Sequence, residues 1–474
     1  MRNLLLLLPL IAASQSVVIR LHDSGLRAAA NFTRQWLHLA MPQFILPSFR
    51  QDFSTSFATG RMAVTNLAVR RFVSPLIRFR PTDHSVLYMS TMSGYAQVTA
   101  DWALDSNVLS MLRIPLDGQI QAQMTGLISE IAMQITPDNS VEMHHCVAQI
   151  RDLRLTLSGS MAADVLHWFR NSLTRAIRKQ LEQEYCDTMR VHWIPWVASQ
   201  LAQFPTNISI SQKPPVTLTG TPESIAMTGQ FVEFRLRSDL IWDGQTVEST
   251  PQRNKTVMEI DSVPKTQKML DIFVDEETVQ SSLAAAHFAD HLKTTIESPF
   301  LDTQCDVLCL GTVVPELAQV LPNKTLAINA KTLSPPIIAL TPDKALVFLN
   351  ASLDVNPQPL TEGIPESLLT VNVETEFALK IEVSKQKVKG NLHMLNAQAT
   401  LVDSKVGLIS QQTVDFLVSM STPFLEDAVD MWVGRYLVDA PDFPTTNEIL
   451  TIHRGFLRYE ADLNIPMLMN RYMN

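Results

Sequence analysis

The segment from Cys146 to Cys186 constrains the fold of this chain most strongly. Its first half alternates between two faces, as a β-strand does, and a turn at Ser158–Ser160 follows. Beyond the turn the apolar residues recur with the spacing of an amphipathic helix, in a stripe formed by Val165, Phe169, Leu173, Ala176 and Ile177. A bridge between the two cysteines would clamp this helix onto a sheet and stabilise the fold by roughly 3–4 kcal/mol on the chain-entropy model.

The N-terminus has the pattern of a secretory signal. Residues 1–16 contain Arg2, the apolar run Leu4–Ile11 and the small residues Ala12–Ser14, which predicts a signal peptide and a secreted, extracellular protein. Secretion permits disulfides, and four cysteines fit two bridges. Five Asn-X-Ser/Thr acceptors predict glycosylation on the same route. They are Asn31, Asn207, Asn254, Asn323 and Asn350.

Charge is distributed unevenly along the 474 residues. Residues 17–205 contain 17 basic and 14 acidic side chains, a net charge of +3, whereas residues 265–474 contain 15 and 26, a net charge of −11. The two halves therefore differ in electrostatic character, and an acidic secreted chain is a poor partner for nucleic acid. Although 46% of the residues are hydrophobic, no run after the signal reaches the ~18 uncharged apolar residues of a membrane span.

The order of elements is the same in both halves. Residues 17–205 predict a helix between Gly25 and Pro42, a long antiparallel meander over residues 49–135 and the helix that follows Ser160. Residues 206–264 predict a bridging sheet and an exposed linker. Residues 265–474 then predict a helix at Glu277–Ile296, strands including the alternating run Val371–Val383, and a helix at Ser410–Leu437. This is an α+β chain with an architectural repeat.

Several motifs resemble those of a known family. They are the Cys146/Cys186 pair with its strand–turn–helix, the stretch Gly311–Ala318 followed by Pro322 and Asn323, and Arg20, Leu26, Leu37 and Pro47 near the start. On these residues the mature chain resembles the family of bactericidal/permeability-increasing protein, lipopolysaccharide-binding protein, cholesteryl ester transfer protein and phospholipid transfer protein.

The resemblance implies a fold and a ligand. The fold is a boomerang of two barrels, each a twisted antiparallel sheet wrapped around a long helix, joined by a central β-sheet to which the final strand returns. It also implies that Cys146 pairs with Cys186, and that each barrel has an apolar pocket for the acyl chains of a phospholipid or similar amphiphile, with no other cofactor. In the first barrel, the candidate lipid-binding residues are Leu26, Ala29, Ala30, Thr33, Leu37, Val165, Phe169, Leu173 and Ile177. For each residue singly, ordinary core packing is the competing interpretation.

A basic segment raises the question of a bacterial ligand. Six arginines, at positions 50, 61, 70, 71, 78 and 80, lie within 31 residues against the single acid Asp52. Relatives that bind lipopolysaccharide have cationic clusters at the tip of the first barrel. Here the two hairpins expected at that tip, Thr55–Ala63 and Asp101–Asp117, contain one arginine each. We therefore interpret the arginines as a solvated strand face that anionic head groups could still use.

Catalytic and metal motifs find little support. The chain has no G-x-S-x-G elbow and no H-E-x-x-H sequence, so we predict no catalytic residue. Cys305 and Cys309 fit a small-loop disulfide better than a metal site, and His144–His145 is not assigned a metal.

The sequence thus predicts a secreted lipid-binding protein that shields phospholipid-like acyl chains in its apolar pockets. It leaves open whether the protein also transfers lipid between surfaces such as a membrane, a lipoprotein or a bacterial envelope. An innate-immune binder of lipopolysaccharide is the first alternative. A secreted lipase or esterase is the second, and it would require a nucleophile elbow.

Overall fold

The structure is a computed structural model that describes most of the chain. The described residues are 16–41, 48–54, 58–83, 85–108, 112–138, 140–159, 163–202, 207–212, 215–242, 244–246, 258–305, 309–358, 367–384, 387–416, 418–419, 426 and 444–467. Among them, no helix combines the length and apolar character needed to cross a bilayer. The fold is α+β, with three largely antiparallel sheets and few helices.

The chain divides into two compact units. The N-terminal unit comprises Arg20–Phe204, Ser224–Phe234 and Leu463–Asn474, and the C-terminal unit comprises Met1–Ile19, Pro205–Glu223 and Arg235–Asp462.

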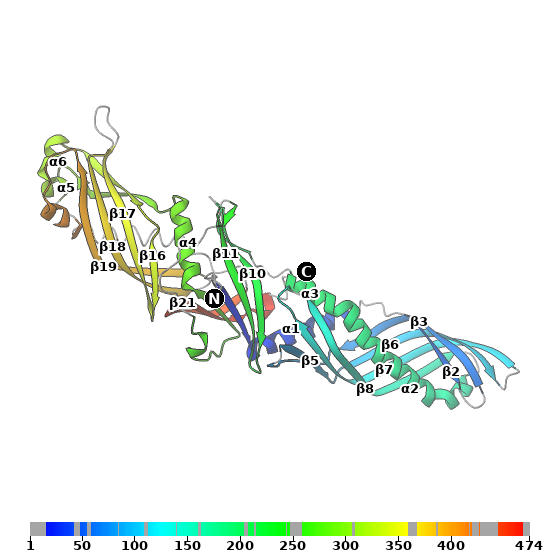
Figure 1. The fold of residues 1–474 in the computed structure, drawn as a ribbon. Helices are drawn as coiled ribbons and strands as arrows, with labels where there is room; N and C mark the ends of the chain where they lie inside the picture. The colour runs from blue at the N-terminus through cyan, green and yellow to red at the C-terminus, as the bar shows by residue number, and fades with distance from the viewer. Residues whose placement is uncertain are drawn as a thin grey trace, which may run out of the picture. The chain divides into compact units, whose positions relative to one another are not determined.

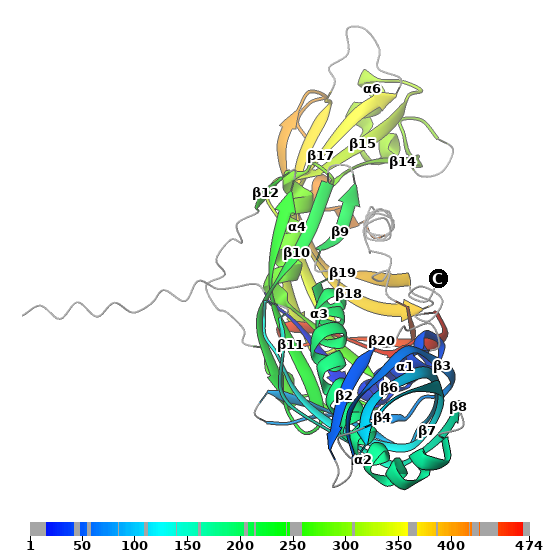
Figure 2. The ribbon, with the colours of Figure 1, turned by 90° about the vertical axis from the view of Figure 1, so that its right-hand side faces the viewer.

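The N-terminal unit combines one seven-stranded sheet with long helices (Figure 1). The strands follow the order β2-β3-β6-β7-β5-β4, and β8 pairs with β7. Figure 2 shows these strands curving around a common interior. The elements are α1 (Asp23–Ala40), β2 (Phe49–Ser54), β3 (Ala58–Val73), β4 (Leu76–Pro81), β5 (Val86–Met92), β6 (Tyr95–Val108), β7 (Leu112–Ile135), β8 (Val141–Gly159), α2 (Ala163–Thr188), the π-helix Met189–Trp193 and α3 (Ile194–Ala202).

A crease crosses this sheet. Strands β5 and β6 pair with successive parts of β7, and the chain bends between them at Ser93 and Gly94, both at positive φ. The bend is repeated in β7 at Gly126, whose amide donates to the Gly94 carbonyl oxygen at 3.1 Å. A Cβ on Gly126 would lie 2.9 Å from the Cβ of Arg151 on β8, so this close approach favours glycine. We call the line through Pro75, Gly94, Gly126 and Arg151 the crease.

A second sheet contains eight strands in the order β20-β21-β13-β1-β11-β10-β9, with β12 paired to β11. The strands are β1 (Ser16–His22), β9 (Asn207–Gln212), β10 (Pro215–Met227), β11 (Phe231–Trp242), β12 (Gln245–Thr246), β13 (Leu270–Asp275), β20 (Thr445–His453) and β21 (Phe456–Leu463). Strands β9 to β12, from the region 206–264, belong to this sheet, and β21 pairs with β13.

The C-terminal unit repeats the combination of helix and antiparallel sheet. Its six-stranded sheet has the order β14-β15-β17-β18-β19, with β16 paired to β17. The elements are α4 (Glu276–Phe288), β14 (Lys293–Asp302), α5 (Leu310–Val313), α6 (Pro315–Val320), β15 (Thr325–Thr332), β16 (Ile337–Thr341), β17 (Lys344–Gln358), β18 (Leu369–Ser384) and β19 (Lys387–Ser404). Residues 411–416, 418–419 and 426 are helical, and the rest of the helix predicted at Ser410–Leu437 lies outside the described residues.

One helix prediction is wrong in its bounds. The helix predicted at Glu277–Ile296 ends at Phe288, because Asp290 adopts a positive φ and the β-branched residues Thr294–Ile296 pair with β15. The stretch Gly311–Ala318, quoted above for the resemblance, lies in two short helices that are interrupted at Val314. Proline follows there and has no amide to donate.

One contact recurs in both units at the same spacing. In the N-terminal unit the Ile150 amide on β8 donates to Glu182 on α2 at 2.7 Å, and in the C-terminal unit the Met394 amide on β19 donates to Glu426 at 2.7 Å. Donor and acceptor are 32 residues apart in each case. A helix glutamate thus anchors its helix on a strand in both units, which gives the architectural repeat a residue-level basis.

Candidate functional site

A disulfide holds helix α2 on the sheet of the N-terminal unit. Cys146 on β8 is bonded to Cys186 on α2, with their Cα atoms 5.8 Å apart, so the pairing implied by the resemblance is confirmed. The Ile150–Glu182 hydrogen bond lies one helical turn away on the same face of α2. Covalent bond and charge-assisted hydrogen bond together fix the position of the C-terminal half of the helix.

A buried hydroxyl chain adds to this anchorage. The Tyr185 hydroxyl lies 3.0 Å from the Ser129 hydroxyl on β7, which lies 2.7 Å from the Thr91 hydroxyl on β5. Burial raises the pKa of Tyr185 above its ordinary value, so the phenol is neutral at physiological pH. Because every member of the chain has a partner, the network tolerates burial and orients α2 without placing a charge inside the unit.

Helix α1 turns one apolar side into the same unit. Leu26 is buried in a cluster with Leu87, Met89, Ile131 and Trp193. Asp23 and Arg27 form an exposed i,i+4 ion pair on the outer side of the helix. The helix is therefore amphipathic as predicted, and its first turns contribute to an apolar interior rather than to a polar site.

The nine candidate lipid-binding residues occupy different parts of this unit. Leu26 and Ala30 are buried, and Ala29, Thr33 and Leu37 are half-buried. Thr33 donates its hydroxyl to the Ala29 carbonyl oxygen within α1 at 2.9 Å. Ile177 is buried in a separate cluster beneath β3, β6, β7 and β8. The side chains of Val165, Phe169 and Leu173 lie outside the described residues.

The structure therefore brings Leu26 and Ile177 into two neighbouring apolar clusters of one unit rather than into a single one. The prediction of a pocket lined by both helices stays a prediction.

The sequence interpretation overlooked the apolar residues that follow α2. Trp193 and Ile194 are buried against the Leu26 cluster, and Met189 and Trp196 pack on it. The sequence run Trp193–Val197 could have revealed them. It places four large apolar residues next to a long helix, a pattern that predicts a continued buried segment. These residues share the buried cluster of Leu26 and are therefore candidates on the same footing.

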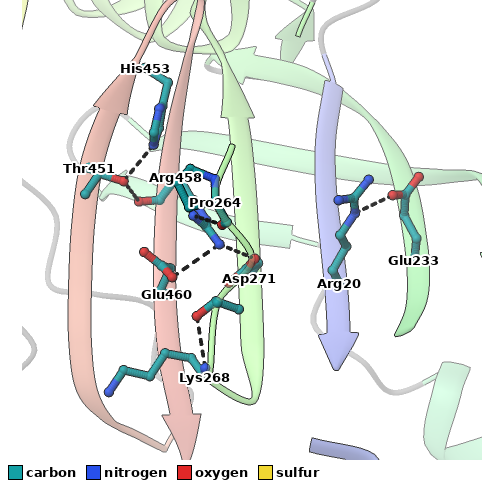
Figure 3. Close-up of polar contacts among 10 residues, drawn as sticks. Arg20, Glu233, Pro264, Lys268, Asp271, Thr451, His453, Arg458 and Glu460 are labelled. Atoms are coloured by element: carbon teal, nitrogen blue, oxygen red, sulfur yellow. Dashed lines mark hydrogen bonds and ion pairs between the residues drawn. The ribbon is translucent and has the colours of Figure 1, made fainter. Parts of the chain in front are cut away.

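Two buried arginines form ion pairs that stabilise strands of the eight-stranded sheet (Figure 3). Arg20 on β1 donates to Glu233 on β11 at 2.6 Å, and its guanidinium lies 4.4 Å from the centre of the Phe231 ring. Arg458 on β21 lies 2.9 Å from Asp271 and 3.2 Å from Glu460, and all three are largely buried. Both arginines have carboxylate partners, so these charges serve the sheet rather than a catalytic step.

The arginines of the basic segment lie on exposed strand surfaces. Arg61 pairs with Asp52 across β2 and β3 at 2.7 Å, and Arg70 donates to Thr99 at 3.0 Å. Arg78 and Arg80 are exposed on the edge strand β4. This arrangement agrees with the prediction of a solvated strand face.

The remaining cysteines and histidines form no metal centre among the described residues. Cys305 and Cys309 form the predicted small-loop disulfide. His144 lies 2.9 Å from the side-chain oxygen of Gln134. No group of three or more candidate ligands occurs in the part of the chain that the structure describes.

Comparison with solved structures identifies the class of fold. The chain superimposes on the crystal structure of lipopolysaccharide binding protein with a TM-score of 0.54, at 17% sequence identity, covering 95% of this chain and 98% of that one. At this identity the likeness shows the fold.

The family follows from the sequence. The LBP / BPI / CETP family, N-terminal domain, matches residues 25–192, and the LBP / BPI / CETP family, C-terminal domain, matches residues 209–465. The chain therefore belongs to this family, whose members are secreted, lipid-binding and not enzymes.

Relatives match along nearly the whole chain. It is 20% identical over 469 residues to lipopolysaccharide-binding protein of Bos taurus, covering 94% of this chain and 93% of that protein. It is 22% identical over 482 residues to bactericidal permeability-increasing protein of Rattus norvegicus, covering 96% and 94%. At about one residue in five, these similarities leave the ligand of this chain open.

Proposed function

We propose that this protein is a secreted, glycosylated carrier that shields the acyl chains of a phospholipid or similar amphiphile and passes the lipid between surfaces. The proposal includes the two-barrel boomerang, with an apolar pocket in each barrel and the nine candidate residues near the first. No bond is broken in the process.

The observation that carries this proposal is the contact between a helix glutamate and a strand amide, which occurs in both units. In each unit an antiparallel sheet is anchored to a helix by a glutamate that accepts a strand amide, and large apolar clusters fill the unit. The apolar side chains of a curved sheet and of the helix that faces it contact one another. When a lipid enters, the same side chains can contact its acyl chains. Transfer of each methylene from water contributes about 0.8 kcal/mol, so two acyl chains are held tightly without a catalytic or charged residue.

Mass spectrometry of lipid that co-purifies with the secreted protein tests the proposal. We expect one or two phospholipid-like molecules per chain, and their head groups would define the ligand class. The matched functional assay is uptake of a fluorescent phospholipid from vesicles. A lipid-free protein that also takes up no lipid would overturn the proposal.

Binding of lipopolysaccharide is a second candidate, favoured by the names of the relatives and by the exposed arginines of β3 and β4. It requires the same apolar interior, since lipopolysaccharide also carries acyl chains. Competition between lipopolysaccharide and the fluorescent phospholipid separates the two. Displacement at a far lower concentration than unlabelled phospholipid would favour lipopolysaccharide.

A further inference from the structure

A band of exposed apolar side chains lies along the crease on the outer face of the N-terminal sheet. Five large apolar residues between 37% and 60% exposed lie in it, on strands β3, β4, β5, β7 and β8. They are Val73, Leu76, Met92, Ile128 and Val147. Single exposed apolar residues are ordinary on a protein surface, but neighbours on adjacent strands form a continuous patch.

Strand register places four of these residues side by side, and Val73 lies opposite Tyr95 on β6. Leu76 and Met92 are directly opposite each other across β4 and β5, and their side chains therefore point to the same face. Thr91 pairs with Ser129, so the next position along each strand places Ile128 beside Met92. Val147 on β8 lies opposite Glu130 of β7, two residues from Ile128 and on the same face.

Cationic side chains border the band. Arg78 and Arg80 follow Leu76 on the same face of the edge strand, because positions two apart on a strand share a side. Arg71 precedes Val73 by the same spacing, and Arg151 is exposed on β8 at the crease. Two acidic residues lie on the strands of this band: Glu130 is opposite Val147, and Asp152 is opposite Thr125 and pairs with Arg154 at 3.0 Å.

Two tyrosines accompany the arginines. The Arg80 guanidinium lies 5.3 Å from the centre of the Tyr88 ring, which is directly opposite it on β5. The Arg71 guanidinium lies 5.8 Å from the Tyr95 ring. Tyrosine and arginine are amphipathic side chains suited to the boundary between apolar and aqueous phases.

We propose that this creased face docks the protein on an anionic lipid surface. The apolar band would enter the boundary between head groups and acyl chains, while the arginines would contact lipid phosphates. Charge complementarity selects this occupant: the four arginines outnumber Glu130 and Asp152, and Asp152 is already paired with Arg154, so the face attracts an anionic surface. A band of Leu, Met, Ile and Val needs no shape-matched partner. The purpose of the docking rests on the proposed function, since a carrier must touch the surface from which it takes lipid.

Flotation of the full-length protein with vesicles tests the proposal. We compare vesicles of phosphatidylcholine alone with vesicles that also contain phosphatidylglycerol, for the wild type and two double variants. Arg78→Ala/Arg80→Ala is expected to lower the apparent affinity for anionic vesicles about 25-fold, at roughly five-fold for each arginine near an anionic surface. Leu76→Ser/Met92→Ser is expected to lower it about ten-fold, and this loss persists at high salt because it is not electrostatic.

Matched controls change similar residues elsewhere. Arg61→Ala removes an exposed arginine of β3 that is already paired, and Leu395→Ser removes an apolar side chain that is 47% exposed on β19. Both are expected to bind vesicles as the wild type does. Unchanged binding of the two patch variants, or equal losses in the controls, would overturn the proposal.

Uptake of a short-chain phospholipid below its micelle concentration separates this proposal from the proposed function, because no surface is involved. Patch variants that lose flotation but retain this uptake support docking. A wild type that takes up the soluble lipid but floats with neither vesicle refutes docking and leaves the carrier function standing. A wild type that floats through the patch but takes up no lipid refutes the carrier function alone.

Discussion

Removal of the Cys146–Cys186 bond is expected to release helix α2 from its sheet while leaving the C-terminal unit intact. The perturbation is the double variant Cys146→Ser/Cys186→Ser, which avoids a free thiol. The two cysteines are 40 residues apart, and the helix they hold carries Ile177 and Tyr185 into the interior of the N-terminal unit.

The magnitude follows from loop closure. On the chain-entropy model, a bond that closes a loop of this length stabilises the docked helix by about 4 kcal/mol at 25 °C. The stabilisation arises because the intact bond keeps the opened helix tethered to its strand. The Ile150–Glu182 hydrogen bond is still present in the variant and contributes about 1.5–3 kcal/mol. The helix is therefore expected to dock still, but to open roughly a thousand times more often.

Native-state hydrogen exchange resolves this opening locally. Amides of residues 177–198 should lose about three orders of magnitude of protection in the variant. The matched control is Cys305→Ser/Cys309→Ser, whose bond spans four residues of the other unit and contributes about 2 kcal/mol on the same model. The control should leave exchange in residues 177–198 unchanged. A loss below ten-fold in the first variant would refute the account of the disulfide as the main clamp.

Two further substitutions and one modification test the structure. Glu233→Gln removes the carboxylate that accepts from the buried Arg20 and should cost about 3–5 kcal/mol in urea unfolding, and a cost under ~1 kcal/mol would contradict the buried pair. Gly311→Ala would overlap the Thr303 carbonyl oxygen and should destabilise by at least about 1–3 kcal/mol, whereas Gly229→Ala meets open space and serves as the control. Asn323 is exposed in a turn at positive φ, so glycopeptide mapping should find it occupied, and an unmodified asparagine there would count against secretion through the glycosylation route.

The sequence was sufficient for the features that depend on short-range pattern. The alternation around Cys146 and the helical stripe before Cys186 both reflect one-sided burial, and one-sided burial leaves a periodic trace. The end of α4 was missed for the opposite reason. Its last turn is followed by Asp290 at positive φ, and the apolar residues beyond it satisfy a helical period equally well until their pairing with β15 is known.

The candidate site was less predictable, because it depends on which apolar faces meet. Leu26 and Ile177 each have the spacing of a buried residue, yet they lie in different clusters of the same unit. The crease lies between the strand segments that pack on the two clusters. It arises from Gly94 and Gly126, whose positive φ cannot be predicted from hydrophobic periodicity. Hydrophobic pattern identifies what is buried, whereas the bends in a sheet decide what is buried together.

The repeat shows how far such reasoning extends once a single contact is known. Adding 244 to the positions of Ile150 and Glu182 gives Met394 and Glu426, which make the same hydrogen bond in the C-terminal unit. The same shift applied to the cysteines of the clamp gives positions 390 and 430, a glycine and an aspartate. The glutamate is thus the anchor common to both units, and the disulfide reinforces it in the N-terminal unit. We therefore expect the segment around Glu426 to separate from its strand more often than the segment around Glu182 does. The reason is that the contact of Glu426 is not reinforced by an equivalent covalent bond.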